Sequence, residues 1–150
     1  MNTQAASIVP NTLNDSVSII AAARQLAPAL RQRAAETDAL RRLPNENIAD
    51  MKAAGLFRTI QASRCGGWQL DFHTHLDVVE AIASGCGASG WCLGVLQIHS
   101  WFAGLMSQQA QDEIYADDPN SLIAAVLSVR GKAKRTSAGY RVSGFWPFGS

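Results

Sequence analysis

The residue of this sequence with the clearest potential for chemistry is His99, which lies in an apolar stretch from Trp91 to Met106. Imidazole titrates near neutral pH, so its side chain can take or give a proton during a reaction. At about 3.6 residues per helical turn, His99 and Trp91 lie roughly 80° apart around one helix and can line the same pocket wall. The alternative is a core histidine satisfied by a neighbouring carbonyl group. The residue types leave both interpretations open.

Two further histidines, His73 and His75, flank Thr74 between two aspartates. Side chains two positions apart on a helix point about 200° away from each other, so these two cannot hold one metal ion together. We therefore predict no metal site here. Solvated or helix-capping roles are expected for both histidines.

Residues 85–90, Gly-Cys-Gly-Ala-Ser-Gly, match the G-x-G-x-x-G pattern of dinucleotide-binding loops. That motif requires a strand before it and an acidic residue about 20 positions later, within a βαβ unit. The segments on both sides of residues 85–90 show helical periodicity instead. We predict that these glycines allow two helices to cross closely.

The overall composition is that of a globular protein, with 47% hydrophobic residues, 17% charged residues and a net charge of +1. Neither sign of charge dominates a long stretch, so no nucleic-acid partner is expected. The apolar residues 91–106 are interrupted by polar side chains and fall short of the ~20 residues that a membrane span needs. With no secretory signal pattern at the start, the sequence favours a cytoplasmic protein without a membrane partner.

The three cysteines, Cys65, Cys86 and Cys92, lack the paired spacing of a zinc site or of a disulfide framework. Free cysteines behave as small hydrophobic residues and are typical of reducing compartments. We expect them to be buried and unpaired.

Helical patterns follow an N-terminus, residues 1–13, that is expected to be disordered. Apolar residues recur at helical spacing from Ile19 to Ala34, where Pro28 predicts a kink or a division into two short helices. A second helix is predicted to begin at Pro44 and to end at Gly55, before the turn-rich residues 61–70.

Three more helices are expected between residues 71 and 116. The first starts near Asp71 and stops at Gly85, and its predicted buried face consists of Phe72, Leu76, Val79 and Ala83. Ser89 is the expected cap of the next helix, which is apolar on nearly all sides and is therefore predicted to be buried on most of them. A polar helix is predicted over residues 107–116.

The pattern changes after residue 118. Residues 122–127 predict a buried strand, residues 132–135 a more exposed one, and residues 137–139 a turn into a strand over 140–146. Helices followed by hairpin-linked strands indicate an α+β fold, with a helical domain (14–118) and the start of an antiparallel β-domain (119–150). Two or three strands cannot bury a face of their own, so this β-domain is expected to be incomplete.

Taken in order, several segments resemble the acyl-CoA dehydrogenase superfamily, and within it the reduced-flavin-dependent monooxygenases, the oxygenase components of two-component aromatic hydroxylases. The segments are Leu43 to Arg58, Cys65-Gly66-Gly67, Ser84 to Trp91, Ile98 to Trp101 and Gly139 to Ser150. The resemblance covers residues 16–150 and rests on order and spacing. It implies a helical domain, a central β-domain and a C-terminal four-helix bundle that drives tetramerisation.

The resemblance also implies reduced flavin (FMN or FAD) as cofactor, a separate flavin reductase, O₂ and a small aromatic substrate. Carried over by position, His99 would act on the substrate as acid or base, and Trp91 would border both substrate and flavin. The remaining flavin contacts, largely through backbone groups, would come from Ala125, Ser128, Phe148, Gly149 and Ser150. Relatives often carry a hydroxyl residue near Ala125 that helps to hold a phenol, and alanine cannot do so.

Two other functions remain open at this point. One is a dehydrogenase acting on a CoA thioester, which would need a catalytic carboxylate from outside these residues. The other is a helical interaction module without chemistry. The association of Trp91, His99 and the aromatic segment 146–148 favours the monooxygenase over both.

Overall fold

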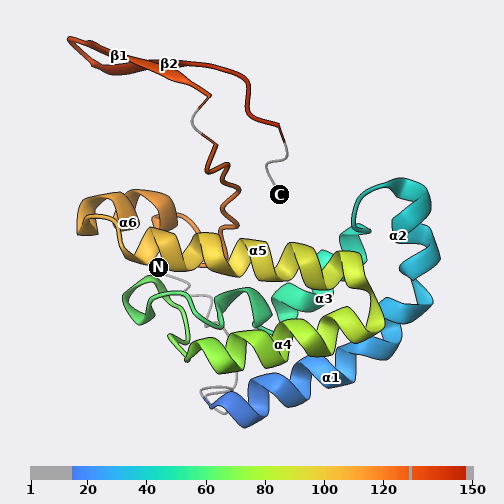
Figure 1. Cartoon of the computed structure of the whole chain (residues 1–150). Helices are drawn as coiled ribbons and strands as arrows, with labels where there is room; N and C mark the ends of the chain where they lie inside the picture. The colour runs from blue at the N-terminus through green and yellow to red at the C-terminus, as the bar shows by residue number, and fades with distance from the viewer. Residues whose placement is uncertain (1–14, 129, 148–150) are drawn as a thin grey trace, which may run out of the picture.

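The computed structural model describes residues 15–128 and 130–147, and in this part of the chain helices precede a two-stranded hairpin (Figure 1). The helices are α1 (Ser16–Gln32), α2 (Ala34–Leu40), α3 (Asn45–Ala53), α4 (Phe72–Gly85), α5 (Gly87–Gly104) and α6 (Gln108–Tyr115), with short 3₁₀ turns at Leu56–Arg58 and Ser63–Cys65. The strands are β1 (Lys132–Thr136) and β2 (Gly139–Ser143). This order confirms the α+β fold predicted from the sequence.

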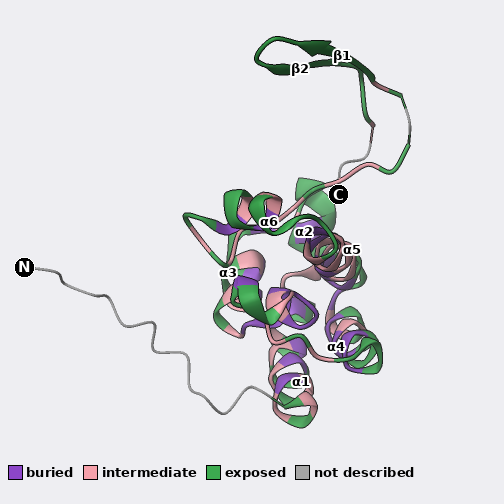
Figure 2. Ribbon diagram, turned by 90° about the vertical axis from the view of Figure 1, so that its left-hand side faces the viewer, coloured by how far each residue is buried: buried purple, intermediate pink, exposed green. Residues whose placement is uncertain are grey.

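Helix α4 packs between α1 and α5 (Figure 1). The three helices bury apolar side chains against one another, including Ile19, Ile82 and Leu93, and Met51 of α3 joins this core. Figure 2 shows buried residues on the facing sides of these helices and exposed residues along the hairpin. Each fully buried side chain of this size contributes about 1.5–3 kcal/mol, so the α1–α4–α5 contacts hold the helical part together.

The first helix begins where its sequence predicts, because the Asp15 carboxylate accepts a hydrogen bond from the Ser18 N–H at 2.7 Å. Helix α1 then continues through Pro28 to Gln32, and α2 starts after Arg33. Pro28 is exposed, so the Arg24 carbonyl that it leaves without an N–H partner can bond to water. Two helices are therefore present, but they divide at Arg33 and not at the proline.

Helix α4 buries a different face from the one that its sequence pattern predicts. Phe72 and Leu76 are 44% and 59% exposed, Ala83 is exposed and Val79 is half-buried. The buried residues are Thr74, His75, Val78, Ala81 and Ile82. The prediction was wrong because α4 is apolar on two sides, and α1 and α5 pack on the side that also carries the polar residues.

Residues 85–90 join helix α4 to helix α5, so they do not follow a strand as the dinucleotide-binding motif requires, and two of their glycines lie where helices meet. A Cβ on Gly85 would overlap the carbonyl oxygen of Ala27 in α1, and a Cβ on Gly90 would lie 2.5 Å from Cβ of Ala83 in α4. Gly87 is different, since a Cβ there would meet nothing within 4 Å. The close-crossing role therefore belongs to Gly85 and Gly90 alone.

Helix α5 starts three residues earlier than predicted. Its cap is Cys86, in an extended conformation, and Ser89 lies in the first turn, where its hydroxyl accepts a hydrogen bond from Asn47 Nδ2 at 3.2 Å. The prediction that α5 is buried on most sides is confirmed after its first turns, since every residue from Cys92 to Gly104 is buried or half-buried. Trp91 is 67% exposed, whereas the polar Gln97 is fully buried.

The chain after α6 contains a hairpin, but residues 122–127 do not form the predicted strand. They have no neighbouring strand with which to pair among the described residues. Strands β1 and β2 pair antiparallel, from Lys132 opposite Ser143 to Thr136 opposite Gly139, and both are exposed along their whole length. At the base of the hairpin the Trp146 indole packs on Gly131 and Gly144, where a Cβ would collide with it.

Candidate functional site

An apolar cavity of about 340 Å³ lies along α5, facing α4 and the segment that follows α6. It is lined by His75 and Val79 of α4, by Gly90, Trp91, Gly94, Val95, Ile98, His99 and Phe102 of α5, and by Leu127. The spacing of the α5 residues places them on one side of that helix. His99 and Trp91 thus border one cavity, as their helical spacing suggested.

His99 is held in a defined orientation at this cavity. Its Nδ1 atom lies 3.0 Å from the carbonyl oxygen of Ile123, and the side chain is almost completely buried. Because a carbonyl oxygen can only accept, Nδ1 carries the proton and Nε2 is unprotonated in the neutral ring. Nε2 has no hydrogen-bond partner among the described residues. It is also not fully enclosed by protein atoms. It is therefore available to a molecule in the cavity.

Trp91 lies at the cavity with most of its indole exposed, which presents a flat apolar surface. The residues expected to contact flavin are placed less fully. Ala125 is half-buried, and Ser128 is exposed and accepts a hydrogen bond from Arg130 Nε at 3.2 Å. Neither lines the cavity, although their neighbour Leu127 does. Phe148, Gly149 and Ser150 lie outside the described residues.

His75 is a further residue of this cavity, and the solvated or capping role predicted for it was wrong. His75 is buried, lines the cavity, and bonds through Nδ1 to Oε1 of Gln97 in α5. His73, two positions earlier, is exposed. The signal was in their spacing, since side chains about 200° apart on a helix that is covered on one side cannot both face solvent.

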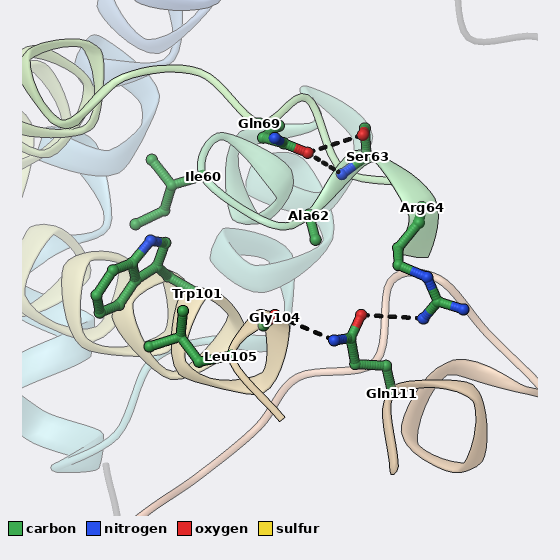
Figure 3. A pocket seen from close by; sticks show the side chains of 9 residues that line it. All are labelled: Ile60, Ala62, Ser63, Arg64, Gln69, Trp101, Gly104, Leu105 and Gln111. Carbon is green, nitrogen blue, oxygen red and sulfur yellow. Dashed lines mark hydrogen bonds between the residues drawn. The ribbon is translucent and has the colours of Figure 1, made fainter. Parts of the chain in front are cut away.

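A second cavity, of about 410 Å³, lies between the loop after α3, the end of α5 and α6 (Figure 3). Its polar side chains are engaged with one another. Gln69 Oε1 accepts hydrogen bonds from the Ser63 N–H and hydroxyl, and Gln111 accepts from Arg64 Nη1 at 2.9 Å and donates to the Gly104 carbonyl at 3.0 Å. These contacts join the loop to both helices, so the polar side chains at this cavity have a structural role.

The cysteines are the other reactive side chains of the described residues. Cys65 and Cys86 are buried and Cys92 is half-buried, and all three are free thiols. Burial raises the pKa of the Cys86 thiol, but hydrogen bonds from Ser89 and Thr37 hold it below its ordinary value overall. Within residues 15–128 and 130–147 no group of three or more His, Cys, Asp or Glu side chains is placed to hold a metal ion. No helix in these ranges is long and apolar enough to cross a membrane.

Comparison with known proteins identifies the class to which this fold belongs. Residues 15–115 match the family model described as acyl-CoA dehydrogenase, N-terminal domain. The chain therefore belongs to the acyl-CoA dehydrogenase family and carries its N-terminal domain. Its relatives include oxygenase subunits of flavin-dependent monooxygenases and the oxygenase component of a p-hydroxyphenylacetate 3-hydroxylase.

Three of these relatives show the extent of the similarity. The oxygenase subunit HsaA of a flavin-dependent monooxygenase from Rhodococcus jostii is 36% identical over 125 residues, which is 83% of this chain and 33% of the relative. The oxygenase component of an FADH₂-dependent resorcinol hydroxylase from a Rhizobium species is 25% identical over 150 residues, all of this chain and 37% of the relative. The solved structure of XiaF from a Streptomyces species, in complex with FADH₂ and glycerol, matches with a TM-score of 0.85 and 26% identity, over 89% of this chain and 34% of that one. The chain spans about a third of the length of the curated relatives it matches.

Proposed function

We propose that this chain is the N-terminal part of the oxygenase component of a two-component monooxygenase, which uses reduced flavin and O₂ to hydroxylate an aromatic or polycyclic small molecule. The observation that carries the proposal is the Nε2 atom of His99, which has no partner among the described residues, is unprotonated in the neutral ring and can therefore act as a base, and belongs to a side chain that lines an apolar cavity. The family membership and the flavin-dependent hydroxylases among its relatives support the same conclusion.

The cavity residues would act on the substrate in two ways. Val95, Ile98 and Phe102 offer apolar surface to a ring and exclude water from it. A phenol hydroxyl bound to His99 Nε2 would donate its proton to the imidazole, and the ring would gain electron density where oxygen is to be added. The Ile123 carbonyl, which holds Nδ1–H, would stabilise the imidazolium that results.

The residues present fit a flavin at the edge of this cavity. Trp91 offers an exposed indole face, and the backbone groups of residues 124–127 make no hydrogen bond within the described chain. An isoalloxazine ring needs both a flat apolar neighbour and hydrogen-bonding partners for its polar edge. We infer that Trp91 and the backbone around Ala125 and Ser128 would hold it, with Phe148, Gly149 and Ser150 as further candidates. Reduced flavin, FMN or FAD, would supply two electrons and activate O₂.

The proposal also covers the source of the reduced flavin, the oligomeric state and the localisation of the protein. A separate reductase would supply the reduced flavin, as the oxygenase components among the relatives imply. We further propose that the complete protein is a cytoplasmic homotetramer. The alternative, oxidation of a CoA thioester, is not favoured, because the histidine at the cavity suits an aromatic hydroxyl and the relatives are hydroxylases.

The experiment that tests the proposal is an ¹⁸O₂ assay of the natural protein that carries this chain. The protein is combined with a flavin reductase, NADH, FMN or FAD, and a panel of phenols. One ¹⁸O atom should enter the ring of the product, and the other should leave as water. Oxidation of an acyl-CoA thioester by an artificial electron acceptor, with no ¹⁸O in any phenol, would show that the protein is a dehydrogenase.

A further inference from the structure

The hydrogen bonds around Gln97 fix the protonation state of His75. Both N–H groups of the Gln97 amide are used, since Nε2 donates to the Leu56 carbonyl at 2.5 Å and to the Thr59 hydroxyl oxygen at 3.1 Å. The Thr59 hydroxyl itself donates to the Leu56 carbonyl, so its oxygen can only accept from Gln97. The amide orientation is therefore settled, and Gln97 Oε1 must accept from His75 Nδ1–H.

The other nitrogen of His75 is consequently an acceptor in the neutral ring. Nε2 has no hydrogen-bond partner in the described part of the chain, and protein atoms do not enclose it fully. The side chain lines the apolar cavity. His75 thus repeats the arrangement of His99, with Nδ1–H anchored to the protein and Nε2 left for the cavity.

The two imidazoles lie on different sides of that cavity. Gln97 and His99 are two positions apart on α5 and project about 200° away from each other. His75 is bound to Gln97, so it lies on the α4 side of α5, and His99 lies on the side of Ile123. Val95 and Ile98 occupy the surface between them.

We propose that His75 is a second substrate-binding residue and that the cavity takes an aromatic molecule with two hydroxyl groups. One hydroxyl would donate to His99 Nε2 and the other to His75 Nε2. The proposal rests on the proposed function, because it assigns the second end of the same substrate. A molecule with a single hydroxyl would leave one imidazole nitrogen unpaired in an apolar site, which costs free energy.

The first test compares benzenediols with phenol in the natural protein, supplied with reductase and flavin. The variant is His75→Asn, since the asparagine amide can replace Nδ1–H at Gln97 but does not reach the position of Nε2. The matched control is His73→Asn on the exposed side of α4. In the unchanged protein, kcat/KM for the best of the three benzenediols should exceed that for phenol. His75→Asn should reduce that ratio about tenfold, mainly through KM for the diol, and His73→Asn should leave it unchanged.

An equal ratio in His75→Asn and in the unchanged protein, with phenol still hydroxylated, would overturn the second contact and leave the proposed function intact. Hydroxylation of neither phenol nor benzenediol by the unchanged protein would overturn both. A further measurement does not depend on any variant folding. Nitrogen-15 NMR spectra of the imidazoles at a pH where they are neutral should show the Nδ1–H tautomer at His75, and the Nε2–H tautomer there would overturn the proposal.

Discussion

The Nδ1 atom of His99 lies 3.0 Å from the carbonyl oxygen of Ile123, a residue 24 positions later in the chain. This hydrogen bond does two things. It fastens the segment after α6 to α5, which brings Leu127 to the cavity, and it leaves Nε2 as the atom that faces a bound molecule. The structural and the proposed catalytic interpretation of His99 are therefore compatible, because they use different ring nitrogens.

Glycine substitutions at residues 85 and 87 should differ in their effect on stability. Gly85→Ala places a Cβ against the Ala27 carbonyl, which is backbone and cannot move without shifting α1, so we expect a loss of about 1–3 kcal/mol. Gly87→Ala meets open space in the first turn of α5 and should be neutral or slightly stabilising. Chemical denaturation of both variants measures this, and equal destabilisation would contradict the packing role assigned to Gly85.

The cap of α4 should make stability depend on pH. The Asp71 carboxylate accepts from the Thr74 N–H at 3.0 Å, and this bond, together with the Thr74 hydroxyl, lowers the pKa of Asp71 below its ordinary 3.8. Because folding lowers this pKa, the ionised Asp71 carboxylate stabilises the fold above about pH 4. This stabilisation is lost as the pH falls through the pKa of Asp71 in the folded protein. Asp71→Ala should therefore lower Tm at neutral pH, with a difference from the unchanged chain that shrinks towards about pH 2. A Tm difference that stays constant over that range would contradict the charged cap.

Gln97 should be more important for stability than its surface counterparts. Gln97→Met removes the acceptor of His75 Nδ1–H and leaves that buried donor unpaired, at a cost of about 1–3 kcal/mol. The control is Gln108→Met in the exposed first turn of α6, which should stay within about 0.5 kcal/mol of the unchanged chain. If both variants unfold at the same denaturant concentration, the Gln97 network does not stabilise the fold.

Trp91 should matter for binding and not for folding. Its indole is 67% exposed, so Trp91→Ala removes little buried surface and should leave Tm nearly unchanged. In the natural protein the same change should weaken the binding of reduced flavin, or of the aromatic substrate, measured by anaerobic titration. A large fall in Tm without a change in either affinity would mean that Trp91 is a packing residue.

The sequence predicts the order of the helices, the start of α4 near Asp71 and the hairpin after residue 131, because these depend on local patterns. It fails where a pattern is compatible with two environments. The apolar residues of α4 lie on two sides, and periodicity does not say which side α1 and α5 cover. Residues 122–127 are apolar like a buried strand, but here a carbonyl of that segment accepts from His99.

The site shows the same division between local and tertiary information. Helical spacing is enough to place Trp91 and His99 at one cavity. His75 could not be assigned without the fold, since its role depends on Gln97 of another helix and, through Gln97, on Leu56 and Thr59.

The most direct test of the account is the coupling of oxygen consumption to product formation in His99→Asn. Asparagine keeps a donor for the Ile123 carbonyl but has no group at the position of Nε2, so the fold and the consumption of reduced flavin and O₂ should be retained. Hydroxylated product should fall by roughly 10²–10⁴-fold, with hydrogen peroxide released in its place, whereas His73→Asn should behave like the unchanged protein. An unchanged ratio of product to consumed oxygen in folded His99→Asn would contradict the role of His99 as the acid or base at the substrate.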